Sequence, residues 1–293
     1  MTDQAEFLVE EFERHRPHLR AVAYRMLGSV AEAEDALQDA WLRVSRADSG
    51  DVDNMGGWLT TIVARVCLNL LRTRAHRRET PLDVHVPDPL ISRDDRPDPE
   101  QQALLADAVG LALLVVLDQL SPAERLAFVL HDLFDLPMAE IAPMLDRTPA
   151  ATRQLASRAR RRVRGGAPEP DRDLGRQRQV VDAFFAAANR GDFDALLAVL
   201  HPDVVLRSDG GSARPQMTMV LHGAAAVARQ AFASTPLAPF VHRALVNGAA
   251  GVIVAPHGRV QFVMAFTVTG GRIMAIDVLS DPERLGRLEL DPV

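Results

Sequence analysis

The sequence predicts a three-domain chain, in which two all-α segments precede an α+β domain. Apolar residues recur at helical spacing as far as about residue 164, whereas strand-like apolar runs dominate after residue 200. Two stretches rich in proline, glycine and charge interrupt these patterns, and the first is expected to be an extended acidic connector without regular structure. The predicted divisions are 1–79, a linker over 80–100, 101–164, a second linker over 165–175, and 176–293.

The composition is that of a globular protein in a reducing compartment. Of the 293 residues, 47% are hydrophobic and 25% charged, and Cys67 is the single cysteine, which excludes an internal disulfide and a cysteine-based zinc cluster. The longest apolar stretch, 108–117, is far shorter than the roughly 20 residues that span a bilayer. The first residues lack the basic region of a signal peptide. We therefore expect a cytoplasmic protein without a metal, a cofactor or a membrane partner.

The charge balance limits how this chain can meet nucleic acid. All 33 basic residues are arginine, and with 39 acidic residues the formal net charge is −6. The excess lies in the N-terminal part, where 22 arginines accompany 29 acids up to residue 175. A negative summed field repels phosphate. Any contact with DNA must therefore be local or assisted by another protein.

The first segment predicts three amphipathic helices. Pro17 is expected to restart the first helix. Ser29 and Glu32 form a capping-box pattern at the start of the second helix. A polar loop over 46–57 precedes the third helix, which is expected to begin at Trp58 and ends in a run of basic residues.

The second segment predicts a helix-turn-helix. A buried helix over 101–120 is followed by Ser121-Pro122-Ala123-Glu124, which combines a capping box with proline at the first helical position. A short helix over 137–145 precedes Thr148, which caps the last helix. From 151 to 164 that helix carries six arginines and no acid. This arrangement is the one that places side chains in the major groove of DNA.

The third segment predicts a cone-shaped α+β domain with a curved antiparallel sheet. Gly270-Gly271 is a hairpin turn between its last two strands. The expected helices span 176–189, 193–200 and 224–233, and the expected strands span 204–207, 241–246, 251–255, 260–269 and 272–279.

Three motifs in order make residues 6–164 resemble a bacterial sigma factor of the extracytoplasmic-function (ECF) group. Residues 33–43 are similar to the family's polymerase-binding helix, 58–65 to its promoter-element helix, and 120–164 to the domain that reads the upstream promoter element. The resemblance implies two all-α sigma domains, the second with the helix-turn-helix. It implies two partners, core RNA polymerase through its beta and beta-prime subunits, and promoter DNA.

The resemblance and the helix patterns together assign site residues. The resemblance assigns polymerase binding to Asp35, Gln38, Asp39, Leu42 and Arg43. The DNA-binding residues are Arg65, Arg72, Arg74, Arg77, Thr148, Arg153, Gln154, Ser157, Arg158, Arg160 and Arg161. Arginine and glutamine in the first turns of the last helix suit guanine and adenine edges. The arginines further along the helix suit phosphates.

The C-terminal part resembles the SnoaL-like group, which is related to ketosteroid isomerase and nuclear transport factor 2. The chain as a whole resembles a subgroup of ECF sigma factors in which a fused SnoaL-like extension regulates the sigma part. Three short motifs carry this resemblance, at 86–89, 209–212 and 281–285. It assigns a regulatory role to Pro87, Asp88, Pro89, Asp209, Gly210, Gly211, Asp281, Pro282 and Leu285. Activation and inhibition are both compatible with this resemblance.

Two alternatives use the same C-terminal fold. A cone closed at one end forms a pocket, which could take a small-molecule ligand and make the chain a ligand-sensing helix-turn-helix repressor. The pocket could also belong to an isomerase or cyclase fused to a DNA-binding module. The candidate acid and base groups for that reaction are His201, Asp203, Asp209, His222, His242 and Asp277. No pair of them has a spacing that fixes a mutual geometry, so the predicted function is that of a sigma factor and not of an enzyme.

Overall fold

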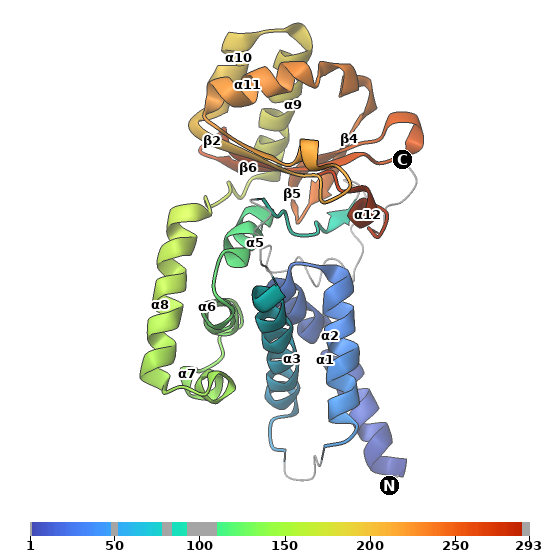
Figure 1. Cartoon of the computed structure of the whole chain (residues 1–293), viewed down its shortest axis with the longest axis vertical. Coiled ribbons are helices and arrows are strands. Elements are labelled where there is room, and N and C mark those ends of the chain that lie inside the picture. The colour runs from blue at the N-terminus through green and yellow to red at the C-terminus, as the bar shows by residue number, and fades with distance from the viewer. Residues whose placement is uncertain (1, 48–51, 78–83, 93–109, 289–293) are drawn as a thin grey trace. The chain divides into compact units, whose positions relative to one another are not determined.

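The computed structural model describes residues 2–47, 52–77, 84–92 and 110–288 (Figure 1). The chain divides into two compact units, and the division falls inside helix α5 (Leu111–Asp118). The first unit holds the helices that precede the proline-rich linker together with the helix-turn-helix. The second unit holds linker residues 84–92 and the chain from residue 167 onward. No described helix is both long enough and apolar enough to cross a bilayer.

Three helices begin the first unit, α1 (Thr2–Leu27), α2 (Val30–Val44) and α3 (Met55–Arg77). The α1 helix continues through Pro17, so the expected restart is wrong. A proline leaves the carbonyl four residues earlier, that of Glu13, without its helical partner. Both residues are exposed, so solvent can reach that carbonyl and the helix is not interrupted.

The starts of α2 and α3 differ in detail from the predictions. The Ser29 hydroxyl caps α2 by accepting from the Glu32 amide at 3.5 Å, as predicted. The Glu32 carboxylate, however, pairs with Arg74 on α3, so this contact links the two helices. The α3 helix begins three residues before the predicted Trp58, because the Asn54 side chain accepts from the Gly57 amide at 3.0 Å and caps an earlier turn.

The helix-turn-helix follows the predicted pattern. Its helices are α6 (Pro122–Phe128), continued by a π-helical turn over 129–133, then α7 (Met138–Ile141), continued by a 3₁₀ turn over 142–145, and α8 (Pro149–Gly166). Ser121 and Glu124 form the complete capping box. The Thr148 hydroxyl accepts from the Ala151 amide at 3.2 Å, which confirms the predicted cap of α8.

A buried arginine joins the helix-turn-helix to α1 within the first unit. Arg125 on α6 is 2% exposed, donates from Nε to the carbonyl oxygen of Arg25 at 3.2 Å, and pairs with Asp118 at 3.2 Å. Burial lowers the pKa of Arg125 to about 10, and Asp118 opposes this shift. A buried charge is retained at low cost only when it is paired and hydrogen-bonded, so this joint depends on both partners.

The second unit is a seven-stranded sheet with three helices, α9, α10 and α11, on one face. Its helices are α9 (Leu174–Arg190), α10 (Phe193–Val199), α11 (Ala224–Ala233) and α12 (Pro282–Leu285). Its strands are β1 (Ile91–Ser92), β2 (Leu200–Asp209), β3 (Met219–His222), β4 (Val241–Val246), β5 (Ala249–Val254), β6 (Phe262–Thr269) and β7 (Arg272–Leu279). Figure 1 shows α9, α10 and α11 together on one side of this sheet.

The sheet order is β1-β4-β5-β6-β7-β2-β3. Every neighbouring pair is antiparallel except β2 and β7, which run parallel, so the predicted all-antiparallel sheet is wrong at this pair. The prediction also lacked β3. The Gly270-Gly271 turn between β6 and β7 is confirmed, and both glycines have positive φ.

The proline-rich linker was expected to lack regular structure, and this expectation is wrong for Ile91 and Ser92. These two residues form strand β1 and pair antiparallel with Val246 and Leu245 of β4. The neighbouring Val84, Val86 and Leu90 are buried. The described part of the linker therefore belongs to the C-terminal fold.

Candidate functional site

The solvent face of α2 carries the residues that were predicted to bind polymerase. Asp35, Gln38, Asp39, Leu42 and Arg43 are all exposed, while the opposite face of the helix is buried in the bundle. Leu42 is 51% exposed and lies among these polar side chains. An exposed leucine among acidic and polar side chains suits a protein partner.

Two of the four arginines assigned to DNA on α3 share an exposed face. Arg65 and Arg72 lie two helical turns apart and, with Arg43 of α2, line a crevice of about 220 Å³ in the first unit. Arg74 differs, because it pairs with Glu32 and donates to the carbonyl oxygen of Leu27 at 3.1 Å. Arg74 therefore fastens the bundle.

Arg77 is the last residue of α3, and its side chain lies outside the described residues.

The α8 helix separates into a buried face and a cationic face. Thr152, Leu155, Ala156 and Ala159 are buried against the domain. The exposed face carries side chains at successive helical turns, namely Arg153, Gln154, Ser157, Arg158, Arg161 and Arg164. Arg153, Gln154 and Ser157 lie in the first three turns, where a recognition helix contacts base edges.

Ion pairs within the domain distinguish the later arginines of α8 from one another. Arg160 is only partly exposed and pairs with Asp132. Arg158 lies 3.6 Å from the Glu124 carboxylate, which also accepts from Arg162 at 3.3 Å. Arg161 forms no ion pair with a described residue. Arg161 is therefore a stronger candidate for a phosphate contact than Arg158 or Arg160, although all three were assigned to DNA.

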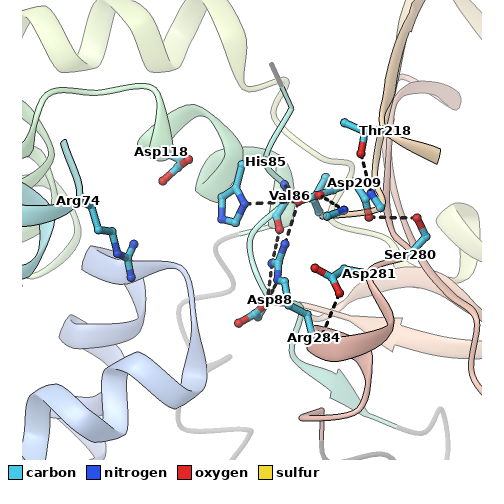
Figure 2. Close-up of polar contacts among 12 residues, drawn as sticks. Arg74, His85, Val86, Asp88, Asp118, Asp209, Thr218, Ser280, Asp281 and Arg284 are labelled. Atoms are coloured by element: carbon cyan, nitrogen blue, oxygen red, sulfur yellow. Dashed lines mark hydrogen bonds and ion pairs between the residues drawn. The ribbon is translucent and has the colours of Figure 1, made fainter. Parts of the chain in front are cut away.

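The three motifs that were assigned a regulatory role meet around Arg284 in the second unit (Figure 2). From α12, Arg284 donates to Asp88 of the linker at 2.7 Å through Nε and to Asp209 of β2 at 2.8 Å through Nη1. Its Nη2 donates to the carbonyl oxygen of Val86. One guanidinium thus holds the linker against the end of β2, and we call Val86, Asp88, Asp209 and Arg284 the linker clamp.

Asp209 is the anionic centre of the linker clamp. Its Oδ2 accepts from the Val86 amide at 3.0 Å and lies 3.4 Å from Nδ1 of His85, and its Oδ1 accepts from the Gly211 amide at 3.0 Å. Burial alone would raise the pKa of this carboxyl, but the hydrogen bonds from His85 and Val86 and the charge of Arg284 lower the pKa to about 2. Asp209 is therefore ionised at neutral pH.

The two glycines of the Asp-Gly-Gly motif are required by close packing. A Cβ on Gly210 would lie 2.1 Å from the carbonyl oxygen of Arg214. Gly211 has a φ of +60°, and a Cβ there would meet the Asp281 carboxylate. That carboxylate caps α12 by accepting from the Glu283 amide at 2.9 Å. The motif residues at 209–211 and 281 therefore build the shape that presents Arg284.

The remaining assigned regulatory residues are apolar or begin a helix. Pro87 and Pro89 of the linker are at least partly buried, Leu285 is 4% exposed, and Pro282 is the first residue of α12.

A second anchor fixes the far end of the described linker. The Leu90 amide donates to Oδ1 of Asn247 at 3.1 Å, and the Asn247 amide donates to the carbonyl oxygen of Leu90 at 2.8 Å. Asn247 is 2% exposed and has a φ of +50° in the turn between β4 and β5. The reciprocal bonds set the register that continues into β1.

Sequence reasoning missed two residues that hold the linker. Arg284 stood within a recognised motif and was the one cation in it, so its charge beside acidic motifs was a usable signal. Asn247 precedes Gly248, and Asn-Gly signals a hairpin turn. Nothing in the sequence indicated that this asparagine would bind a segment 157 residues away.

The helix-covered face of the sheet encloses a cavity of about 130 Å³. Its wall is mostly apolar, with aromatic and thioether side chains from Phe184, Phe185, Met217, Met219, Phe262 and Met264. Polar side chains lie at Ser208, Asn189, Gln230, Ser234 and Thr235, and no ionisable residue in the described ranges lines the cavity.

None of the six candidate acid and base groups reaches this cavity, so their assignment to a catalytic pocket is wrong. Strand alternation explains two of them, because Ser208 and Val278 line the cavity while the neighbouring Asp209 and Asp277 face the other side of the sheet. Asp209 belongs to the linker clamp, and Asp277 pairs with Arg207 at 3.1 Å. The remaining four are His201, Asp203, His222 and His242, none of which lines the cavity.

Comparison with known families matches each part of the chain. Sigma-70 region 2 matches residues 12–77, Sigma-70 region 4 matches 110–163, and a SnoaL-like domain matches 181–279. These are the helical bundle, the helix-turn-helix and the cone.

Individual relatives extend over nearly the whole chain. The ECF RNA polymerase sigma factor SigJ of Mycobacterium tuberculosis is 37% identical, covering 94% of this chain and 92% of the relative. The probable ECF RNA polymerase sigma factor SigI of the same species is 34% identical, covering 94% of both chains. The crystal structure of SigJ superposes with a TM-score of 0.77 at 36% identity, covering 97% of this chain and all of that one. The chain therefore belongs to the family of extracytoplasmic-function RNA polymerase sigma factors.

Proposed function

We propose that this chain binds core RNA polymerase and directs it to particular promoters, and that the C-terminal domain inhibits this activity by holding the linker. Family membership supports the first part and excludes the enzymatic alternative. The linker clamp is the observation that carries the second part. The chain then acts where RNA polymerase acts, in the cytoplasm.

The exposed faces of α2 and α8 supply the two contacts that initiation needs. Leu42 and the polar residues around it offer a protein-binding surface, and the cationic face of α8 offers a DNA-binding surface. Because the chain is acidic overall, binding to DNA is expected to require the polymerase complex. The ligand-sensing repressor is thereby disfavoured, since it would occupy operator DNA alone.

Inhibition follows from what the linker residues do in the second unit. The resemblance to sigma factors implies that the linker between the two sigma domains threads through the polymerase channel. Residues 84–92 cannot do so while Val86 and Asp88 are bonded to Arg284 and Leu90 is bonded to Asn247. The clamp therefore competes with the active placement of the linker, and its release favours transcription.

Transcription from a cognate promoter with purified core polymerase tests this proposal. Arg284→Ala removes the three contacts that Arg284 makes in the linker clamp and is expected to raise the transcript yield several-fold when core polymerase is limiting. Arg287→Ala is the matched control, because Arg287 is exposed and pairs only with Glu283 within the described chain. Arg287→Ala should give the wild-type yield.

Two results would each contradict one part of the proposal, either the inhibition or the sigma mechanism. An Arg284→Ala yield at or below that of the wild type would reject inhibition by the clamp. Promoter footprints by the chain without core polymerase would reject the sigma mechanism.

A further inference from the structure

A crevice in the first unit gathers three arginines that form no ion pair with a described residue. Arg65 and Arg72 come from α3 and Arg43 comes from α2, and the crevice that they line has a volume of about 220 Å³. Asn69 adds an amide between the two arginines of α3, since residues three or four positions apart are neighbours on a helix. All four side chains belong to exposed residues, so a molecule in solution can reach them.

Other arginines of the same unit are neutralised within the fold. Their partners are carboxylates, in the pairs Arg74 with Glu32, Arg125 with Asp118 and Arg160 with Asp132. Within the described chain, the one carboxylate that lines the crevice is that of Asp146, which follows the 3₁₀ turn over 142–145. Because a guanidinium stays protonated, the crevice carries three positive charges against one negative charge.

The walls of the crevice strengthen its attraction for anions. Leu68 and Met144 contribute apolar surface to the lining and are 1% and 4% exposed. The 3₁₀ turn that holds Met144 lies against α3, so the crevice is bounded by the bundle and by the helix-turn-helix. A cleft with apolar walls and charges of one sign focuses the electric field and concentrates counter-ions. An anion is therefore attracted more strongly here than to a single arginine on an open helix face.

The donors select the class of anion. A guanidinium binds phosphate through two parallel hydrogen bonds, so three arginines suit a group with many phosphate oxygens. The excess of two positive charges favours an anion of at least that charge, and the volume has room for two phosphate groups. A carboxylate with a single charge satisfies neither condition.

We propose that this crevice binds a small molecule that carries a diphosphate group. Arg43, Arg65 and Arg72 bind the phosphate oxygens, and Asn69 donates a further hydrogen bond. The site goes beyond the DNA contacts assigned to Arg65 and Arg72, because its ligand is a soluble molecule that also lies beside the helix-turn-helix. If the proposed sigma function holds, the ligand competes with DNA for these two arginines.

Inorganic pyrophosphate and ADP are the probes, because they carry the same group free in solution and attached to a nucleoside. We expect saturable binding of both to the full-length chain by isothermal titration calorimetry, in magnesium-free buffer of constant ionic strength. AMP has one phosphate and should bind at least tenfold more weakly than ADP. The tighter of the two probes identifies the source of the diphosphate. Since neither polymerase nor DNA is present, the result is independent of the proposed sigma function.

A double variant locates the binding. Arg65→Ala with Arg72→Ala removes two of the three arginines and should weaken pyrophosphate binding at least a hundredfold, about tenfold for each charged hydrogen-bond donor. Arg229→Ala with Arg272→Ala is the matched control, because it removes the same charge at exposed positions of the second unit and should not change binding.

Removal of the opposing carboxylate should have the reverse effect. Asp146→Asn leaves the crevice without a negative charge and should tighten pyrophosphate binding several-fold. Asparagine tolerates the φ of +53° at this position, so the turn is retained. Asp203→Asn removes the same charge from a side chain that is 89% exposed in the second unit, and it should leave binding unchanged.

Three results would overturn the proposal. They are no saturable binding of pyrophosphate or ADP, binding of AMP as tightly as ADP, and equal effects of the crevice variants and their matched controls.

Discussion

At the scale of single residues, Asp209 shows how one ionised group fixes a distant segment. Its carboxylate receives the Val86 amide and the Arg284 guanidinium, and both contacts favour the charged form. Without this charge, the Arg284 guanidinium keeps one carboxylate partner among the described residues, Asp88. The stability of the second unit should therefore depend on the ionisation of Asp209.

The pH dependence of this contribution has a definite sign. The pKa of Asp209 falls from an ordinary value of 3.8 to about 2 in the folded chain. This shift corresponds to about 2 kcal/mol of stability. A lowered pKa gives a contribution that is fully present above the ordinary value and is lost as the pH falls through the folded value. Asp209→Asn should thus destabilise the second unit by about 2 kcal/mol at pH 7, and the difference should shrink between pH 4 and pH 2.

Scanning calorimetry of wild type and variant across that pH range measures this difference. Asp203→Asn is the control, because the Asp203 side chain is 89% exposed and should have little effect at any pH. A wild-type advantage over Asp209→Asn that stays constant down to pH 2 would show that the Asp209 charge is not its source.

At the scale of elements, we propose that sequence choice and affinity depend on side chains in different turns of α8. Arg153 and Gln154 occupy the exposed start of the helix, and Arg161 and Arg164 continue the same face toward its end. None of these four forms an ion pair with a described residue. Arg160, in contrast, is held by Asp132, so its substitution should affect the domain itself.

Two double variants should therefore change different properties of DNA binding. Arg153→Ala with Gln154→Ala should reduce the preference for the cognate upstream element, because a bidentate base contact contributes about 1–3 kcal/mol of discrimination. Arg161→Ala with Arg164→Ala should weaken binding to all sequences alike and reduce the salt slope by about 1 for each arginine that no longer neutralises a phosphate. Competition binding by the assembled polymerase complex at several salt concentrations measures both quantities. Equal effects on all promoters from both pairs would contradict this division.

Local signals in the sequence predicted most elements. Ser121 with Glu124, Thr148 before Pro149, and the Gly270-Gly271 turn each fix a helix start or a hairpin through contacts a few residues apart. Such contacts depend on neighbouring residues, so a single sequence reveals them. The motifs of the candidate regulatory site were recognised in the same way.

Features that depend on distant partners were not predicted. The parallel pairing of β2 with β7 and the addition of Ile91 to β4 join segments with no local pattern in common. The ion pair between Arg74 and Glu32 was not predicted for the same reason, since it depends on how α2 packs on α3. Sequence identified the motif residues, but only the fold showed that Arg284 connects them.

At the scale of the whole molecule, strand β2 connects the cavity to the linker. Ser208 faces the cavity and the next residue, Asp209, faces the linker, because side chains alternate along a strand. Asp209 and Arg284 lie 123 and 198 residues from Val86 in sequence. Release of the linker by opening of this part of the sheet would therefore also open the cavity.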